Sequence, residues 1–349
     1  MIRVLHLLGH TPDFETERGA AVLAKNAGAN YSIDRRTIGP GGDYRHSLLA
    51  AFLLRRRIGR DVDVVHAWGE GARIAAVAAG ARQIVFSPGE FPTPRHILRL
   101  KHALTISDVR IACSSQSLRR AYLSAGITED RLTLIRPAVE MPSAPPARDA
   151  GLRRALGFCD GDYVILAPGE STRSAGHRDT LWAASVLHVL DPTYKILLWG
   201  RGDQTLSCVR LAEKLRQPTL LTVAEWKLGR RLDFSQLPSV ADGAVFSPIG
   251  ATPTLPLTLC MAAGLPVVAT PAALALELLK DWQNAVLVAR HAPRLFAQSV
   301  LEMRTNGGAT PAAGTSASNN KLAAFSCERY VDEFRRLYLS HAISACEKP

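Results

Sequence analysis

The stretch Cys260-Met-Ala-Ala-Gly-Leu-Pro-Val-Val-Ala-Thr270 ends in a short apolar run, which predicts a buried strand at Pro266–Ala269. Similar runs recur along the chain and are separated by longer stretches in which apolar residues have helical spacing. Strands that are buried on both faces and alternate with helices are typical of parallel α/β sheets. We therefore predict one such sheet in each half of the chain. The other expected strands are Ile2–Leu8, Val62–His66, Gln83–Ser87, Val109–Cys113, Leu132–Ile135, Tyr163–Ala167, Lys195–Trp199 and Gly243–Ser247.

The length of the chain and a proline-rich segment divide it into two domains. A chain of 349 residues is too long for one ordinary core, so two domains of comparable size are expected. Four prolines between Pro137 and Ala147 fit neither a helix nor a central strand, which indicates a linker. We predict an N-terminal domain at 1–140, a linker at 141–150, a C-terminal domain at 151–325 and a final helix at 326–349. The Gly/Ser/Asn-rich stretch Thr305–Asn320 is expected to be a surface loop.

The formal net charge of +11 favours an anionic partner. Nucleic acid is not expected, because the sequence has no zinc-finger spacing, aromatic RNA-binding signature or helix-turn-helix pattern. Phosphorylated small molecules and an anionic membrane surface remain as candidates. The six cysteines are scattered, without the clustering of a disulfide framework or a zinc site, so reduced thiols, no metal and a cytoplasmic location are expected.

Two basic groups in the first half lie next to apolar residues. One is Leu53–Arg60, and the other consists of Arg95, Arg99, Lys101 and His102. Such groups suit the surface of an anionic membrane, which predicts peripheral contact with the inner face of the membrane. The alternative is an ordinary solvated helix face.

Four segments, taken in order, resemble the large retaining family 4 of the glycosyltransferases. They are Ile111–Val139, Ile165–Gly176, Ile196–Gly202 and Ala241–Thr270, and Met261–Thr270 is the most specific part of them. The closing stretch Phe325–Tyr338 is also similar to the last helix of that family, which crosses back to the first domain. The resemblance covers nearly the whole chain.

This resemblance implies the GT-B fold, an α/β architecture of two Rossmann-like domains with parallel sheets that face each other across a central crevice. It also implies transfer of a hexose from a nucleotide sugar to a glycan or lipid-linked acceptor, with retention, and without a metal or other cofactor. Ligands of such folds lie at the carboxyl ends of the strands, where glycine-rich turns let the backbone approach a diphosphate. The expected donor-binding residues are Gly169, Glu170, Arg173, Gly200, Gly202, Ser247, Thr252, Thr254 and Leu255.

The sequence departs from the family pattern where the donor diphosphate and sugar are expected. An Arg and a Lys are replaced by Glu170 and Ala175, and a pair of glutamates is replaced by Ala251 and Leu259. Arg173, His177 and Arg178 are nearby cations that could substitute. The departures leave two alternatives open: a catalytically inactive GT-B protein that acts as a binding or scaffold module, and another sugar-nucleotide enzyme such as an epimerase.

Several single residues are candidates for acceptor or phosphate contacts. His66 ends a predicted strand and is a candidate for proton transfer, with a structural histidine as the alternative. Glu70 and Glu90 are candidate carboxylates near the acceptor. The alternative is that both are ordinary exposed loop residues. Arg201, Arg230 and Arg231 are candidate phosphate contacts or plain surface charges.

Overall fold

The structure is a computed structural model, and it divides into two compact units. Unit 1 is Met1–Ala138 with Ala324–Pro349, and unit 2 is Val139–Ala323. The structure describes residues 1–9, 12–38, 51–56, 58, 61–140, 147–250, 252–279, 285–305 and 322–346. Ala251, Arg57, Arg60, most of the predicted linker and nearly all of the predicted surface loop lie outside these residues.

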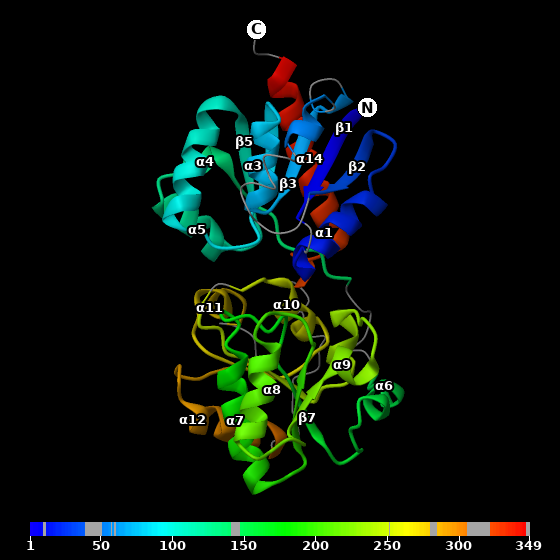
Figure 1. The fold of residues 1–349 in the computed structure, drawn as a ribbon, viewed down its shortest axis with the longest axis vertical. Coiled ribbons are helices and arrows are strands. Elements are labelled where there is room, and N and C mark those ends of the chain that lie inside the picture. Colours follow the sequence, from blue (N-terminus) through cyan, green and yellow to red (C-terminus); the bar gives the residue numbers. More distant parts are fainter. Residues whose placement is uncertain are drawn as a thin grey trace. The chain divides into compact units, whose positions relative to one another are not determined.

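Unit 1 is built on a six-stranded parallel sheet in the order β2-β1-β3-β4-β5-β6 (Figure 1). The strands are β1 (Ile2–Leu8), β2 (Tyr31–Thr37), β3 (Val64–Trp68), β4 (Gln83–Ser87), β5 (Asp108–Cys113) and β6 (Leu132–Leu134). Strand β1 pairs with β2 on one side and with β3 on the other. The chain therefore reverses its direction of growth at β1, and in open α/β sheets this reversal is where ligands bind.

Helices cover both faces of the first sheet. Apolar residues on one face pack with α3 (Glu70–Ala78), α4 (Pro94–Ile106) and α5 (Gln116–Ser124). The other face packs with α1 (Phe14–Lys25) and α14 (Cys327–Cys346), as Figure 1 shows. A short 3-10 helix, η1 (Glu129–Arg131), precedes β6. Helices α1, α4 and α5 each begin with a side-chain cap. The N-cap side chains accept a hydrogen bond from a backbone amide of the first turn, and these N-cap residues are Asp13, Thr93 and Ser115.

Unit 2 is built on a second six-stranded parallel sheet, in the order β12-β11-β10-β7-β8-β9. Its strands are β7 (Tyr163–Leu166), β8 (Tyr194–Leu198), β9 (Leu221–Val223), β10 (Gly243–Phe246), β11 (Val267–Ala269) and β12 (Ala285–Leu287). Its helices are α6 (Ala150–Ala155), α7 (His177–Leu190), α8 (Thr205–Lys214), α9 (Ala224–Leu228), η2 (Phe234–Ser239), α10 (Leu255–Ala262), α11 (Ala273–Leu279) and α12 (Pro293–Thr305). The strand order reverses between β7 and β10, so this is the position where a Rossmann-like sheet binds its ligand.

The predicted α/β class with two parallel sheets is confirmed, whereas three strands were not predicted. The missed strands β2, β9 and β12 are all at sheet edges. An edge strand has one neighbour and is less covered, so it does not need the continuous apolar run that identifies a central strand. Strand β2, with the sequence YSIDRRT, has no fully buried residue.

Strand β3 lies two residues later than predicted, and Asp63, just before it, is tied to Arg3 of β1. The Asp63 carboxylate accepts a hydrogen bond from the Arg3 backbone amide at 2.8 Å, and it forms an ion pair with the Arg3 guanidinium at 3.1 Å. The strand begins at Val64 and continues to Trp68.

Candidate functional site

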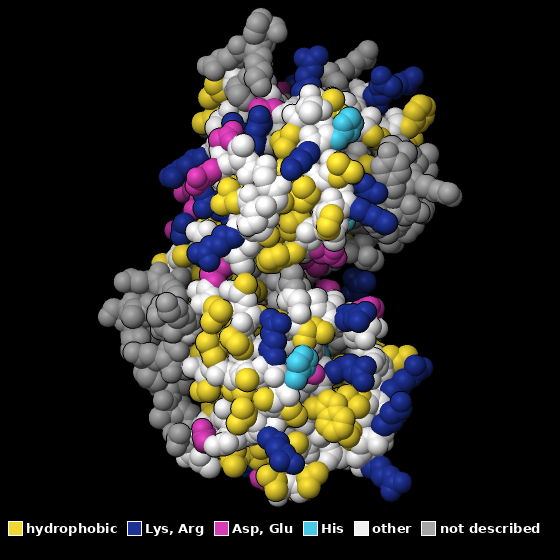
Figure 2. All heavy atoms as spheres, turned by 90° about the vertical axis from the view of Figure 1, so that its left-hand side faces the viewer, with side chains coloured by type: hydrophobic (Ala, Val, Ile, Leu, Met, Phe, Trp, Pro, Cys, Tyr) yellow, Lys and Arg dark blue, Asp and Glu magenta, His cyan; other side chains and the backbone are white. Residues whose placement is uncertain are grey.

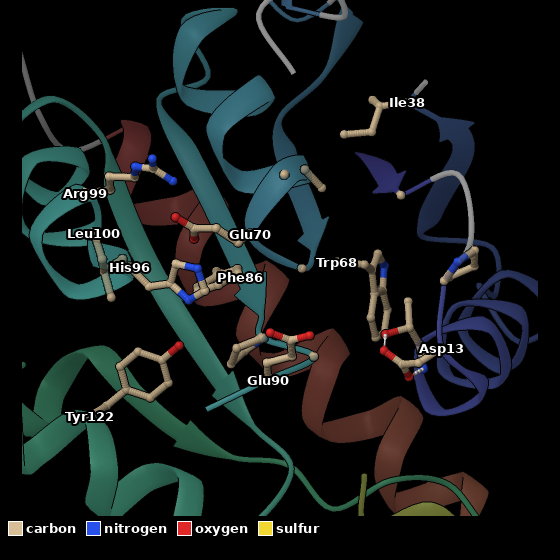
Figure 3. A pocket seen from close by; sticks show the side chains of 18 residues that line it. Asp13, Ile38, Trp68, Glu70, Phe86, Glu90, His96, Arg99, Leu100 and Tyr122 are labelled. Atoms are coloured by element: carbon tan, nitrogen blue, oxygen red, sulfur yellow. Dashed lines mark hydrogen bonds between the residues drawn. The ribbon is translucent and has the colours of Figure 1, made fainter. Parts of the chain in front are cut away.

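A cavity of about 370 Å³ opens in unit 1 at the carboxyl ends of β1, β3 and β4. It is lined by residues that follow these strands, among them Gly9, Gly69 and Pro88, and by residues from α1, α4 and α5. Figure 3 shows His96 and Arg99 on one side of it, Asp13 beside Trp68 on the other, and Glu70 and Glu90 between them. The cavity therefore occupies the ligand-binding position that the strand order of unit 1 predicts.

Two carboxylates of the cavity are already held by neighbours. Asp13 caps α1, and its oxygens accept hydrogen bonds from the Thr16 amide at 2.9 Å and the Thr16 hydroxyl at 3.1 Å. Burial raises the pKa of Asp13. Glu70 forms a two-point ion pair with Arg73, whose guanidinium is fully buried over the Phe86 ring. These contacts fix both carboxylates in the cavity wall.

The third carboxylate and the two basic groups of the cavity are more exposed. Glu90 lies on the loop after β4, and its carboxylate contacts no polar group within the described parts of the chain. His96 and Arg99 extend into the cavity from successive turns of α4, as Figure 3 shows. Carboxylates accept hydrogen bonds from hydroxyls, and guanidinium and imidazole groups bind anions. The cavity is therefore suited to a polyhydroxylated ligand that also carries a negative charge.

Tyr122 adds a neutral donor at the base of the cavity. Its side chain is 2% exposed, and this burial raises the pKa of the phenol. The phenol therefore remains protonated and can donate one hydrogen bond.

The candidate His66 is buried behind the cavity wall and does not line the cavity. Its Nδ1 lies 2.6 Å from the Tyr338 hydroxyl, and its Nε2 lies 2.8 Å from the Ser87 hydroxyl. The ring stacks on Trp68 with centroids 4.0 Å apart. Burial lowers the pKa of His66 well below its usual range, so the ring is neutral. Its place in the structure favours a role in positioning Trp68, which does line the cavity.

In unit 2, the turn after β7 is shaped by glycines that approach other backbone segments. Gly176 has φ +69°, and a Cβ there would lie 1.9 Å from the Ser247 carbonyl oxygen. Gly202 has φ +104°, and a Cβ would lie 2.4 Å from the Ser171 carbonyl oxygen. Gly202 is thus required by packing within the protein. Gly169 has φ +88°, and a Cβ there would lie 3.2 Å from Cγ of the Pro256 ring.

His177 locks this turn and is not available as a cation. Its Nε2–H donates to the Pro168 carbonyl at 3.1 Å, so its Nδ1 accepts from the Ser171 hydroxyl at 2.9 Å. Burial lowers the pKa of His177 to about 4. The neutral ring therefore cannot replace the cation that the resemblance implies. Ala175, at the position of the expected Lys, is itself buried.

The remaining expected donor-binding residues differ in accessibility. The Ser247 hydroxyl donates to the Gly176 carbonyl at 2.9 Å and contacts the Thr180 hydroxyl at 2.8 Å, so it is occupied within the protein. Thr254 and Leu255 are buried, as is Leu259, which replaces one expected glutamate. Glu170 and Thr252 are half-buried, and Arg173 is exposed. The accessible polar side chains of this set are therefore Glu170 and Arg173, because the hydroxyl oxygen of Thr252 is itself buried.

Arg201 is held at the carboxyl end of β8. Its Nε donates to Glu225 at 3.1 Å, and its guanidinium lies 4.2 Å from the centroid of the Trp199 ring. Arg230 and Arg231 are exposed. Glu225 also accepts a hydrogen bond from the Leu232 backbone amide at 3.0 Å. The Arg201–Glu225 pair therefore connects the segment after α9 to the end of β8.

Sequence reasoning missed the cavity contributions of Asp13, Tyr122 and His96. A signal existed for Asp13, because an aspartate before a helical pattern is an N-cap. No local signal identifies Tyr122 or His96, because their part in the cavity depends on how α4 and α5 pack on the sheet.

Two units with parallel Rossmann-like sheets, each reversing its strand order at a ligand position, define the GT-B fold of glycosyltransferases. Residues 163–306 match the family model described as Glycosyl transferases group 1. The matched segment runs from β7 to the end of α12.

Solved structures and a curated relative agree with this fold. The chain is similar to HepE of Anabaena, solved in complex with UDP and glucose, with a TM-score of 0.77 and 17% identity over 97% of this chain and 100% of that one. It is also similar to sucrose-phosphate synthase of Thermosynechococcus elongatus, with a TM-score of 0.78 and 13% identity over 97% and 99%. The putative glycosyltransferase EpsD of Bacillus subtilis (strain 168) is 24% identical over 196 residues, which are 56% of this chain. The chain spans about half the length of that relative.

The described residues hold neither a metal-binding cluster nor a membrane-spanning helix. They contain no group of three or more His, Cys, Asp or Glu side chains that could hold a metal ion. Among the same residues, no helix is both long and apolar enough to cross a membrane.

Proposed function

We propose that this protein is a retaining glycosyltransferase that transfers a hexose from a nucleotide sugar to a glycan or lipid-linked acceptor. The observation that carries the proposal is the match of residues 163–306 to group 1 glycosyl transferases, since this segment contains the β7–β10 reversal and its glycine turns. The complex of HepE with UDP and glucose supports a nucleotide sugar as the donor.

The donor diphosphate is proposed to bind at the turn that contains Gly169 and Arg173, beside the start of α10. Helix starts attract anions through their exposed amides and the helix dipole. Thr254, the N-cap residue of α10, makes no side-chain capping hydrogen bond to a described residue. The exposed Arg173 supplies a cation, whereas Glu170 in the same turn opposes a diphosphate. Binding therefore rests mainly on the backbone and on Arg173, without a metal ion.

The acceptor is proposed to bind in the unit 1 cavity. Glu90 would accept hydrogen bonds from acceptor hydroxyls, and Tyr122 would donate one. His96 and Arg99 suit a phosphate or carboxylate of the acceptor. A cytoplasmic location is proposed on the basis of the thiols, because Cys113, Cys159, Cys208 and Cys260 form no disulfide within the described residues.

Thermal unfolding with and without UDP, GDP and ADP tests the donor site. A nucleotide at about 100 times its Kd should add roughly 2.7 kcal/mol to the free energy of unfolding. We expect one nucleotide to raise the Tm, Arg173→Ala to reduce that shift, and Glu170→Gln to increase it. EDTA should leave the shift unchanged.

The exposed Arg210 of α8 provides a control, because Arg210→Ala makes the same substitution outside the turn. A shift that is absent for every nucleotide would contradict the transferase proposal. It would favour the inactive binding module instead. An epimerase would show the nucleotide shift but would interconvert the sugar without an acceptor.

A further inference from the structure

Helix α7 of unit 2 has an apolar outer side. Trp182 and Val189 lie about two turns apart on this side, and the stretch Thr180–Leu190 contains no Lys, Arg, Asp or Glu. The other side of the helix packs in the core of unit 2 through Leu181 and Leu187. A surface helix normally carries charged or polar residues on the side away from the core. The outer side of α7 therefore lacks the composition of a surface that faces water.

Helix α12 lies beside α7 in a register that is fixed by contacts at both ends. At one end, Nδ1 of His291, just before α12, lies 3.1 Å from the carboxylate of Asp179 in the first turn of α7. At the other end, Arg304 in the last turn of α12 forms an ion pair at 3.0 Å with Asp191, just after α7. The two helices therefore run in the same direction, and their middles are level with each other.

Exposed apolar side chains continue across both helices. Five large ones are between 40% and 74% exposed, and they are Trp182, Val189, Leu190, Leu295 and Leu301. We call the outer surface of α7 and α12 the α7–α12 face. Figure 2 looks onto the side of Figure 1 that carries α12, and it shows apolar side chains gathered over this part of unit 2. Apolar side chains that are gathered on one surface, unlike scattered ones, mark an interaction site.

Charged side chains lie at the two ends of the α7–α12 face. Arg178 and Arg294 are exposed in the first turns of α7 and α12, and Glu302 is exposed in the last turn of α12. None of these three side chains forms an ion pair with a residue that the structure describes. The face is therefore basic at one end and carries an unneutralised carboxylate at the other.

These positions match those on a second copy whose helices run in the opposite direction. Arg294 and Glu302 are equally far in sequence from Gln298, and the end contacts place Gln298 level with the middle of the segment between Trp182 and Val189. One two-fold axis across both helices would therefore set Arg294 against Glu302 of the second copy. The same axis would set Trp182 against Val189 of the second copy. It would also oppose the positive and negative ends of the two α7 dipoles.

The order of charges distinguishes this partner from others. A parallel pairing of two copies would bring the basic ends with Arg178 and Arg294 together. An anionic bilayer would attract that end but repel Glu302 at the other. An antiparallel second copy presents the opposite order of charges and an equally apolar middle, so it fits the whole face.

We propose that two copies of this chain associate through their α7–α12 faces, about a two-fold axis that crosses the helices. Trp182 supplies the main apolar contact, because a Trp with one buried and one exposed side is the kind of residue that dominates interfaces. Arg294 and Glu302 select the antiparallel orientation. The proposal rests on unit 2 and does not depend on the proposed glycosyltransferase function.

Sedimentation velocity of the full chain over a range of concentrations tests the association. We expect a monomer–dimer equilibrium, and Trp182→Ala should raise its Kd at least about 30-fold, because the contact occurs twice in the dimer. Trp226→Ala is the matched control, since Trp226 lies on α9 outside the face and is 51% exposed, against 44% for Trp182. This variant should dimerise nearly as the parent does. Val189→Ser, at a side chain that is 74% exposed and contributes little to the core, should raise the Kd severalfold.

A charge swap tests the orientation. Arg294→Glu alone and Glu302→Arg alone should each raise the Kd severalfold, because each sets like charges together at two symmetry-related places. The double variant with both substitutions should restore the Kd of the parent, since the opposite charges then face each other again.

Three results would each overturn the proposal. They are a chain that stays monomeric at every concentration, a Trp182→Ala variant that dimerises like the parent, and a double charge variant that is not rescued. A monomeric chain that binds anionic vesicles, with weaker binding in Trp182→Ala, would assign the face to a membrane instead.

Discussion

Gly176 and Gly229 have nearly the same left-handed backbone conformation in very different surroundings. Their φ values are +69° and +63°, so a Cβ would strain both residues. At Gly176 the Cβ would also lie 1.9 Å from the Ser247 carbonyl, whereas at Gly229 nothing lies within 4 Å of it. The pair thus separates backbone strain from steric overlap within one unit.

We expect Gly229→Ala to lower the free energy of unfolding by about 1 kcal/mol, the usual penalty for a left-handed residue with a Cβ. Gly176→Ala should cost about 3 kcal/mol, because the turn after β7 must also move away from β10. Urea unfolding followed by circular dichroism measures both. Equal losses would show that Ser247 yields easily and that the contact does not hold the turn in place.

His177 shows where single-residue reasoning from sequence reaches its limit. Its position next to Gly176 made it a candidate replacement cation, but the sequence does not reveal that the Pro168 carbonyl and the Ser171 hydroxyl enclose its ring. Because its pKa is lowered to about 4, the folded state binds its proton less tightly than the unfolded state. The stability that this residue supports is complete above about pH 6.5 and is lost as the pH falls toward 4.

At the scale of elements, α14 is attached to its sheet through a buried polar cluster. The Tyr338 hydroxyl lies 2.6 Å from His66 Nδ1 and 3.2 Å from His6 Nε2. Burial lowers the pKa of His6 to about 3 and that of His66 well below its usual range, so both rings are neutral. The hydroxyl has one proton, so it donates to one histidine and accepts from the other.

Tyr338→Phe removes both hydrogen bonds and leaves two buried ring nitrogens without this partner. We expect a loss of about 1–3 kcal/mol in the free energy of unfolding of unit 1. We also expect faster amide hydrogen exchange in α14, measured by mass spectrometry. Tyr330→Phe is the control, since Tyr330 is buried on the same helix and its hydroxyl bonds neither histidine. Unchanged exchange in the Tyr338 variant would mean that apolar packing alone attaches α14.

How well an element could be predicted depended on its place in the sheet. The central strands β1, β4, β7 and β10 are buried on both faces, so their apolar runs identified them within one residue. Three of the four edge strands, β2, β9 and β12, are partly exposed and carried no such signal, whereas the edge strand β6 was predicted. The carboxyl-end turns of unit 2 could be located from glycine spacing, whereas the unit 1 cavity depends on packing between helices that no local pattern encodes.

At the scale of the whole molecule, the two units differ in how the chain builds them. Unit 2 is one continuous segment, Val139–Ala323, whereas unit 1 combines Met1–Ala138 with the C-terminal segment that contains α14. In unit 1, Phe334 and Tyr338 of α14 are almost fully buried against apolar residues of β1 and β3. Without α14, those residues would be exposed to water.

We therefore expect a fragment of residues 139–323 to unfold cooperatively and a fragment of residues 1–138 not to do so. Adding a peptide of residues 324–349 to the second fragment should restore a cooperative transition, because it supplies the missing apolar face. Calorimetry of the separate fragments measures this. Cooperative unfolding of residues 1–138 alone would show that the sheet and the α3–α5 layer form a sufficient core.

The split construction of unit 1 also sets the order of events on the ribosome. Residues 1–138 emerge before unit 2, whereas α14, which completes unit 1, emerges after unit 2. At the usual 5–20 residues per second, the roughly 200 residues between Ala138 and His341 delay completion by about 10–40 seconds. Unit 2 emerges whole during that interval. In this protein unit 2 can therefore be complete before unit 1, whose apolar sheet face stays uncovered until α14 has emerged.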